Sequence, residues 1–230
     1  MESQYLTPTP FIDFDTSEVA AFAEREAGGS QDSATRAVNL YYAVRDRIYY
    51  DPYDINLTVE GLCASTTLAK GRGWCVAKAV LLAACCRHLQ IPARLGFADV
   101  KNHLSTERLR RRMQTDVFYW HGYTEIYLNG KWVKATPAFN IELCEKFALK
   151  PLEFDGENDS IYHSFDLEGR RHMEYVSFRG EFADVPLEAV IDTFRRRYPS
   201  AVRQWTADAD FDMDVEDETR GLNTGRRDPS

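Results

Sequence analysis

The sequence predicts an α+β fold in which helices pack on an antiparallel sheet. Two stretches within the first fifty residues carry apolar side chains at three- and four-residue steps, the spacing of amphipathic helices. A nearly continuous apolar run follows Gly71-Arg72-Gly73 and indicates a buried helix. Residues 117–136 are rich in aromatic and β-branched side chains around Asn129-Gly130, a strong hairpin signal.

The two N-terminal helices have recognisable ends. The first is predicted over residues 16–27, with Thr16 as N-cap and Gly28-Gly29 as the stop. Asp32 begins the second, which should end near Asp51-Pro52, because proline disfavours helical backbone in the residue before it. Together they supply the helical cover of the predicted core.

The middle of the chain supplies the central helix and the sheet. The helix predicted over residues 75–89 is apolar on nearly every side and should therefore be buried. A strand is expected over 92–100 and a surface helix over 105–114. The hairpin strands are expected over 117–128 and 132–136.

A single domain is predicted for residues 1–205, ending with a helix over 185–198. The segment 207–230 holds eight acidic and three basic residues, so it carries a net charge of −5 out of −8 for the whole chain. Such a composition buries too little apolar surface to fold, and residues 206–230 are therefore expected to form an acidic, disordered tail. The tail would improve solubility or bind a basic partner.

Charge and hydropathy exclude two classes of partner. The body of the chain is nearly neutral and has no broad basic surface for nucleic acid. The basic run over residues 108–112 is expected to be a solvated helix face. Residues 1–15 lack the features of a signal peptide, and no apolar stretch approaches the roughly 20 residues that span a bilayer. We expect a cytoplasmic protein with reduced cysteines and no membrane partner.

Cys75 is the candidate nucleophile because it begins the apolar helix. Unsatisfied N–H groups at a helix N-terminus lower the pKa of a thiol, and the preceding glycines let the backbone approach a substrate carbonyl. The alternative is that Cys75 is a small residue buried at a helix start. Cys85 and Cys86 lie deep in the same helix and are expected to be core residues. No cysteine pair has the spacing of a zinc site, so no metal is expected.

His121 is the candidate general base, since a thiol nucleophile needs a base within hydrogen-bond reach. It lies in the predicted strand 117–128, where a histidine can equally be structural. If Asn129-Gly130 form the hairpin loop, Ala138 faces His121 and Thr136 lies one diagonal step away on the same face. Thr136 is therefore placed to orient the imidazole through a hydrogen bond.

Three blocks of this sequence resemble the transglutaminase-like superfamily. They are the helix end Arg45-Asp46-Arg47-Ile48-Tyr49-Tyr50-Asp51, the block from Gly71-Arg72-Gly73-Trp74-Cys75 to Ile91-Pro92-Ala93-Arg94, and the hairpin His121-Gly122-Tyr123-Thr124-Glu125-Ile126-Tyr127 with Gly130-Lys131-Trp132-Val133. The blocks span roughly residues 36–140 in the family's order. The resemblance implies a papain-like core, with the cysteine helix packed on an antiparallel sheet that carries the histidine. It also implies acyl transfer through a thioester, without cofactor or metal.

The sequence departs from the family at Thr136, where the family usually has aspartate. Three explanations follow: Thr136 orients His121 itself, Asn140 or Asp155 substitutes for the aspartate, or activity is lost. The leading hypothesis is a cysteine-dependent amidohydrolase, protease or acyltransferase that acts on a peptide, a protein or a small amide or thioester. The alternative is a catalytically inactive binding module of the same fold. The residues specify neither an oligomeric state nor the acyl acceptor.

Overall fold

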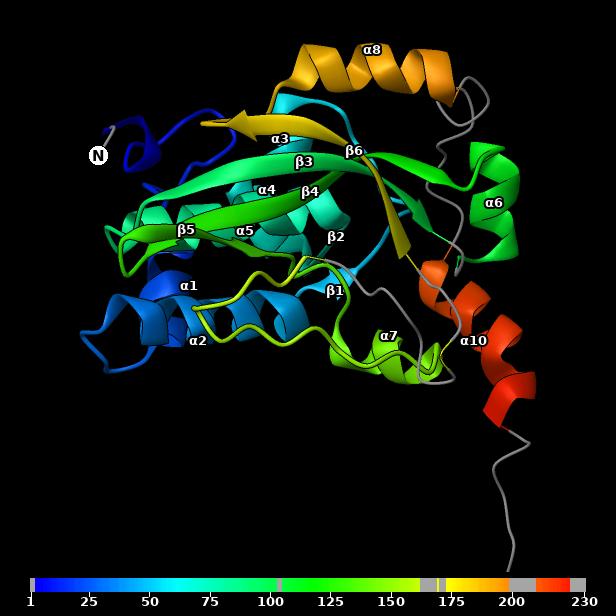
Figure 1. Ribbon diagram of the computed structural model, residues 1–230, viewed down its shortest axis with the longest axis horizontal. Coiled ribbons are helices and arrows are strands. Elements are labelled where there is room, and N and C mark those ends of the chain that lie inside the picture. The colour runs from blue at the N-terminus through cyan, green and yellow to red at the C-terminus, as the bar shows by residue number, and fades with distance from the viewer. Residues whose placement is uncertain (1–2, 103–104, 162–168, 170–172, 199–209, 224–230) are drawn as a thin grey trace, which may run out of the picture.

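An antiparallel sheet and one buried helix form the centre of the molecule (Figure 1). The computed structural model describes residues 3–102, 105–161, 169, 173–198 and 210–223. Within them, the four-stranded sheet has the order β5-β4-β3-β6 and consists of β3 (Ala93–Asn102), β4 (Val117–Leu128), β5 (Lys131–Ala135) and β6 (Met173–Phe182). A short parallel pair joins β1 (Tyr49–Tyr50) to β2 (Arg72–Gly73).

The helices of the described chain surround this sheet. They are the 3₁₀ turn η1 (Ser3–Tyr5) and the α-helices α1 (Ser17–Ala27), α2 (Ser33–Arg47), α3 (Val59–Leu62), α4 (Ala64–Lys70), α5 (Cys75–His88), α6 (Glu107–Met113), α7 (Ile141–Lys146), α8 (Leu187–Arg197) and α10 (Phe211–Asn223). In Figure 1, α8 lies beside β6, whereas α1 and α2 lie on the opposite side of the sheet. None of the described helices is both long and apolar enough to span a lipid bilayer.

Helix α5 is the central element. Every residue from Cys75 to Arg87 is buried, because α5 packs on β3 and β4 with one side and on α1, α2 and α4 with the others. Two of its buried side chains are basic, Lys78 and Arg87, and burial lowers the pKa of Lys78 to about 7. Lys78 Nζ donates hydrogen bonds to the carbonyl groups of Arg45, at 2.9 Å, of Ile48, and of Ala138, at 2.8 Å. Lys78 therefore joins the end of α2 and the segment after β5 to the central helix.

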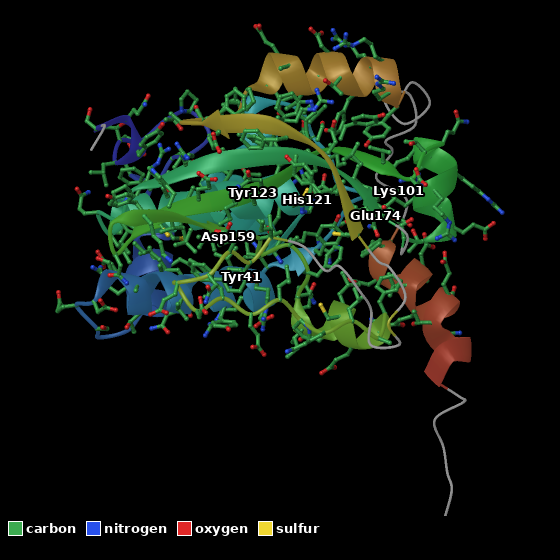
Figure 2. All side chains as sticks on the ribbon, viewed as in Figure 1. Tyr41, Lys101, His121, Tyr123, Asp159 and Glu174 are labelled. Atoms are coloured by element: carbon green, nitrogen blue, oxygen red, sulfur yellow. The ribbon has the colours of Figure 1, made fainter. Side chains whose placement is uncertain are left out.

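The hairpin has the register that the sequence predicts. Leu128 pairs with Lys131, and the ladder continues to Thr124 opposite Ala135. At the other edge of the sheet β6 pairs with β3, where Lys101 faces Glu174, and both residues are labelled in Figure 2. The predicted α+β fold is confirmed. Asp32 caps α2 as predicted, since its carboxylate accepts a hydrogen bond from the Thr35 N–H at 2.8 Å. Thr16 occupies the N-cap position of α1 but makes no capping hydrogen bond with its side chain.

The acidic tail differs from the sequence prediction. Residues 211–223 form helix α10 rather than a disordered segment. Phe211, Val215 and Thr219 follow one another at four-residue steps and are all buried. Helix α10 thus has an apolar face that packs on the body of the protein. The sequence prediction missed this face because it used the average composition of the whole acidic tail. The remaining tail residues, 206–209 and 224–230, lie outside the described chain.

Candidate active site

Cys75 occupies the first position of α5, at the end of a tightly turned segment. Gly71 ends α4 in the left-handed conformation, with φ of 63°, which is the usual role of a C-terminal glycine. Gly73 then pairs with Tyr50 and passes so close to α5 that a Cβ atom there would lie 3.0 Å from Ala77 Cβ. The two glycines of the sequence therefore allow the chain to turn and to deliver Cys75 against the sheet.

His121 comes from β4, at a point where the strand is irregular. The pairing of β3 with β4 shifts register between Ala98, which faces His121, and Val100. Trp120 has φ of 61°, a left-handed conformation that is costly for a bulky residue. The buried Asp99 carboxylate accepts a hydrogen bond from the Trp120 N–H at 3.2 Å and forms an ion pair with Arg179 at 2.6 Å. These contacts hold the bulge that sets the direction of His121, which Figure 2 shows on the strand that also carries Tyr123.

Cys75 and His121 line one cavity. It has a volume of about 30 Å³, roughly the space of two water molecules. Its walls come from five parts of the chain: the 50–55 segment (Tyr50, Pro52, Ile55), the start of α5 (Trp74, Cys75), α6 (Leu109, Met113), β4 (Phe118, Tyr119, His121) and the end of α8 (Phe194, Tyr198). Cys75 is 5% exposed and His121 is also 5% exposed, so the pair is closed to a substrate in this conformation.

A second, smaller cavity lies on the other side of His121. It has a volume of about 10 Å³ and is lined by His121, Thr136 and side chains of the following segment. Thr136 is buried, and its Oγ1 has no hydrogen-bond partner among the described residues. His121 thus shares one cavity with Cys75 and the other with Thr136.

The two other candidates for the orienting residue lie elsewhere. The Asn140 side chain accepts a hydrogen bond from the Tyr50 N–H at 3.1 Å and donates one to Glu142 at 2.8 Å. Asp155 is an exposed turn residue whose pKa is lowered to about 2 by hydrogen bonds from Asn158 and Glu157. Neither residue lines either cavity beside His121.

Burial dominates the protonation of Cys75. It raises the pKa of the thiol to about 11, and the hydrogen bond from the Gly122 N–H offsets only part of this rise, followed by the N–H groups at the helix start. The position of Cys75 at a helix N-terminus predicts a lowered thiol pKa, but in the closed cavity burial raises the pKa instead. The thiolate form requires water or a charged partner to reach Sγ.

The other described cysteines, and His88, lack this setting. Cys85, Cys86 and Cys144 are buried, Cys63 is half-buried, and all are free thiols. His88 is paired with Glu24 at 3.3 Å, far along α5 from Cys75, and the other three histidines lie outside the described residues. Two supporting residues were missed by the sequence reasoning. Lys78 was visible as a lone charge in an apolar helix, whereas nothing in the sequence singles out Asp99.

A cysteine at the start of a buried helix that shares a cavity with a histidine from an antiparallel sheet defines a papain-like arrangement. The family model of the transglutaminase-like superfamily matches residues 20–137, so the chain belongs to that superfamily. A comparison with curated proteins found no match.

Two solved structures are similar to this chain over part of its length. One is from Cytophaga hutchinsonii and is provisionally assigned as a cysteine protease; it is 18% identical, with a TM-score of 0.45, over 77% of this chain and 53% of its own. The other is from Parabacteroides distasonis ATCC 8503 and is provisionally assigned as a protease; it is 15% identical, with a TM-score of 0.37, over 55% of this chain and 25% of its own. The protein therefore spans about half of the first and a quarter of the second.

Proposed function

We propose that the protein is a cysteine-dependent acyl-transfer enzyme that acts on a peptide, a protein or a small amide or thioester. The observation that carries this proposal is the single cavity lined by both Cys75 and His121. In the proposed reaction, Sγ of Cys75 attacks the carbonyl carbon while His121 accepts the thiol proton. The backbone N–H of Cys75 stabilises the oxyanion that develops on the carbonyl oxygen.

His121 then returns the proton to the departing nitrogen or sulfur, and a thioester remains on Cys75. Water or an amine attacks this thioester, and His121 takes a proton from the attacking group as Cys75 leaves. Attack by water makes the enzyme a hydrolase, and attack by an amine makes it an acyltransferase. In this proposal Thr136 Oγ1, which has no hydrogen-bond partner among the described residues in the closed structure, forms the hydrogen bond that orients the imidazole when the site opens. A threonine accepts or donates a hydrogen bond but does not stabilise an imidazolium by charge, so we expect slower chemistry than with a carboxylate.

Alkylation of each cysteine by iodoacetamide, followed by peptide mass spectrometry over a range of pH, tests the proposal. We expect wild-type Cys75 to show a component of labelling below the ordinary thiol pKa of about 8.5, because a thiolate–imidazolium pair forms whenever the cavity opens. In H121A this component should vanish, and labelling should increase only toward the buried thiol's pKa of about 11. T136A should weaken the same component without removing it.

Cys63 serves as the reference thiol in the same molecule, because it is half-buried and lies outside the cavity. Its pH profile should be the same in all three proteins. If the Cys75 profiles of the wild type and H121A coincide, no catalytic pair exists and the enzyme proposal fails.

A non-catalytic binding module is the second candidate. It is favoured by the threonine at position 136 and by the closed cavity, in which Cys75 is 5% exposed. Such a module would label at Cys75 no faster than at Cys63 at every pH. The alkylation series therefore separates the two candidates.

A further inference from the structure

A second, mainly apolar cavity lies next to the Cys75 cavity. The two share Tyr50, Leu109 and Phe118 as lining residues. The second cavity has a volume of about 10 Å³ and is otherwise lined mainly by side chains from α7 and its neighbours, together with Phe211 of α10. We refer to these two neighbouring cavities together as the groove; Cys75 lines one of them and Phe211 lines the other.

Phe211 fills the far end of this groove. Its side chain is 4% exposed, and its ring packs edge-on against Tyr53 at 5.2 Å and against Tyr50 at 5.9 Å between centroids. Met213, on the outer side of the same helix, is 62% exposed. The apolar face of α10 is therefore directed into the groove, and Phe211 is its anchor.

Charged groups fix α10 next to this anchor. Asp214 forms an ion pair with Arg108 at 2.8 Å and accepts a hydrogen bond from the Tyr53 hydroxyl at 2.7 Å. Glu218 accepts a hydrogen bond from the Glu107 N–H at 2.7 Å, and Glu216 pairs with Lys146 on α7 at 3.1 Å. The acidic helix thus contacts α6 through Arg108 and the Glu107 N–H, and Figure 1 shows α10 beside both α6 and α7.

The same contacts hold the walls of the Cys75 cavity. Leu109 and Met113 of α6 line the cavity, and α10 is bonded to α6 through Arg108 and Glu107. Tyr53, which α10 also binds, belongs to the 50–55 segment that forms another wall. Cys75 is only 5% exposed behind these walls, so a substrate reaches its thiol only when they move.

We propose that this groove is a binding site for a peptide segment bearing a large apolar side chain and, three residues later, a carboxylate, and that α10 occupies the site in cis and keeps Cys75 closed. In α10, Phe211 supplies the large apolar side chain and Asp214 supplies the carboxylate. The identification of such a peptide as substrate rests on the proposed function, whereas the closure of Cys75 by α10 does not.

Full-length F211A and D214N test the closure. We expect F211A to raise the iodoacetamide labelling rate of Cys75 at neutral pH by about tenfold, which corresponds to a change of about 1.4 kcal/mol between closed and open forms. D214N should raise the rate by about threefold, because it removes the ion pair but leaves the aromatic anchor. M213A and D217N change exposed positions of the same helix and should leave the rate unchanged. Cys63 again supplies the reference rate.

A synthetic peptide of residues 210–223 tests the binding site itself. Added to F211A, it should slow Cys75 labelling again, whereas the same peptide with alanine in place of Phe211 should not. Unchanged labelling in both F211A and D214N, an equal rise in M213A, or a peptide without effect would overturn the proposal. Circular dichroism of each variant verifies that the fold is intact.

The double variant F211A/H121A distinguishes closure of Cys75 by α10 from catalysis by Cys75 and His121. Access to Cys75 should increase there as it does in F211A alone, because closure needs no imidazole. If F211A opens the site but its pH profile does not depend on His121, the binding site stands and the catalytic proposal fails. If the pH profile of Cys75 labelling depends on His121 but F211A has no effect on the rate, the catalytic proposal stands and the closure by α10 fails.

Discussion

Gly122 lies at a close contact between β4 and α5, next to the base His121 in the sequence. A Cβ atom on this residue would lie 3.0 Å from both Cα and Cγ2 of Val76. Because Val76 follows Cys75 and Gly122 follows His121, the absence of a side chain lets the two reactive groups reach one cavity. The Gly122 N–H also hydrogen-bonds the thiol.

Gly122→Ala should therefore damage both stability and site. The added methyl group meets backbone, which cannot give way as a flexible side chain can, so we expect a loss of about 1–3 kcal/mol in the free energy of unfolding by urea. The His121-dependent part of Cys75 labelling should fall with it. Gly29→Ala is the matched control, since nothing lies within 4 Å of the added atom. A G122A protein as stable as G29A would show that α5 and β4 have room to separate.

Among the elements, α5 is held by a buried lysine rather than by apolar contact alone. Lys78 is 0% exposed and satisfies three carbonyl groups from two other parts of the chain. Lys78→Met keeps the length of the side chain but leaves these carbonyls without their donor. We expect the free energy of unfolding by urea to fall by about 2–4 kcal/mol. The unsatisfied buried carbonyls lower the stability, and the removal of a buried ionisable group offsets part of this loss.

Lys70→Met is the control for this substitution. Lys70 is half-exposed and pairs with Asp54 on the surface, so its replacement should cost less than about 1 kcal/mol. Equal stability of K78M and K70M would mean that the three carbonyls find water or other donors, and that Lys78 does not fasten α2 to α5.

Elements with local signals were predictable from the sequence, and the long-range contacts of the site were not. The two-residue loop Asn129-Gly130 determines the register of the hairpin, so the pairing from Leu128–Lys131 to Thr124–Ala135 followed from it. The glycines before Cys75 and the apolar helix after it are also local signals, so the position of Cys75 at a helix start was predictable. By contrast, the bulge at Trp120 depends on Asp99 from a neighbouring strand, and a single sequence contains no signal that pairs them.

At the scale of the whole molecule, two features that look unrelated in the sequence are partners. The basic run of α6 was expected to be solvated, and the acidic tail was expected to be disordered. In the structure Arg108 pairs with Asp214, and α10 packs through Phe211. The tail's average composition opposes folding, but Phe211 and Val215 share one helical face and find an existing apolar groove. A few apolar side chains on α10 therefore suffice to dock the helix, because the body of the protein supplies the apolar surface on which they pack.

The charge pairing predicts that salt opens the active site. Raising sodium chloride from about 0.05 to 1 M shortens the screening length to about 3 Å, which weakens partly exposed ion pairs such as Arg108–Asp214, whose side chains are 48% and 17% exposed. We expect wild-type Cys75 labelling to increase by about two- to threefold, since a surface pair contributes less than about 1 kcal/mol. In D214N most of this increase should be absent, because the screened pair no longer exists, while D217N should respond as the wild type does. A salt response retained in full by D214N would place the relevant charges elsewhere, and α10 would then be held by Phe211 rather than by its carboxylates.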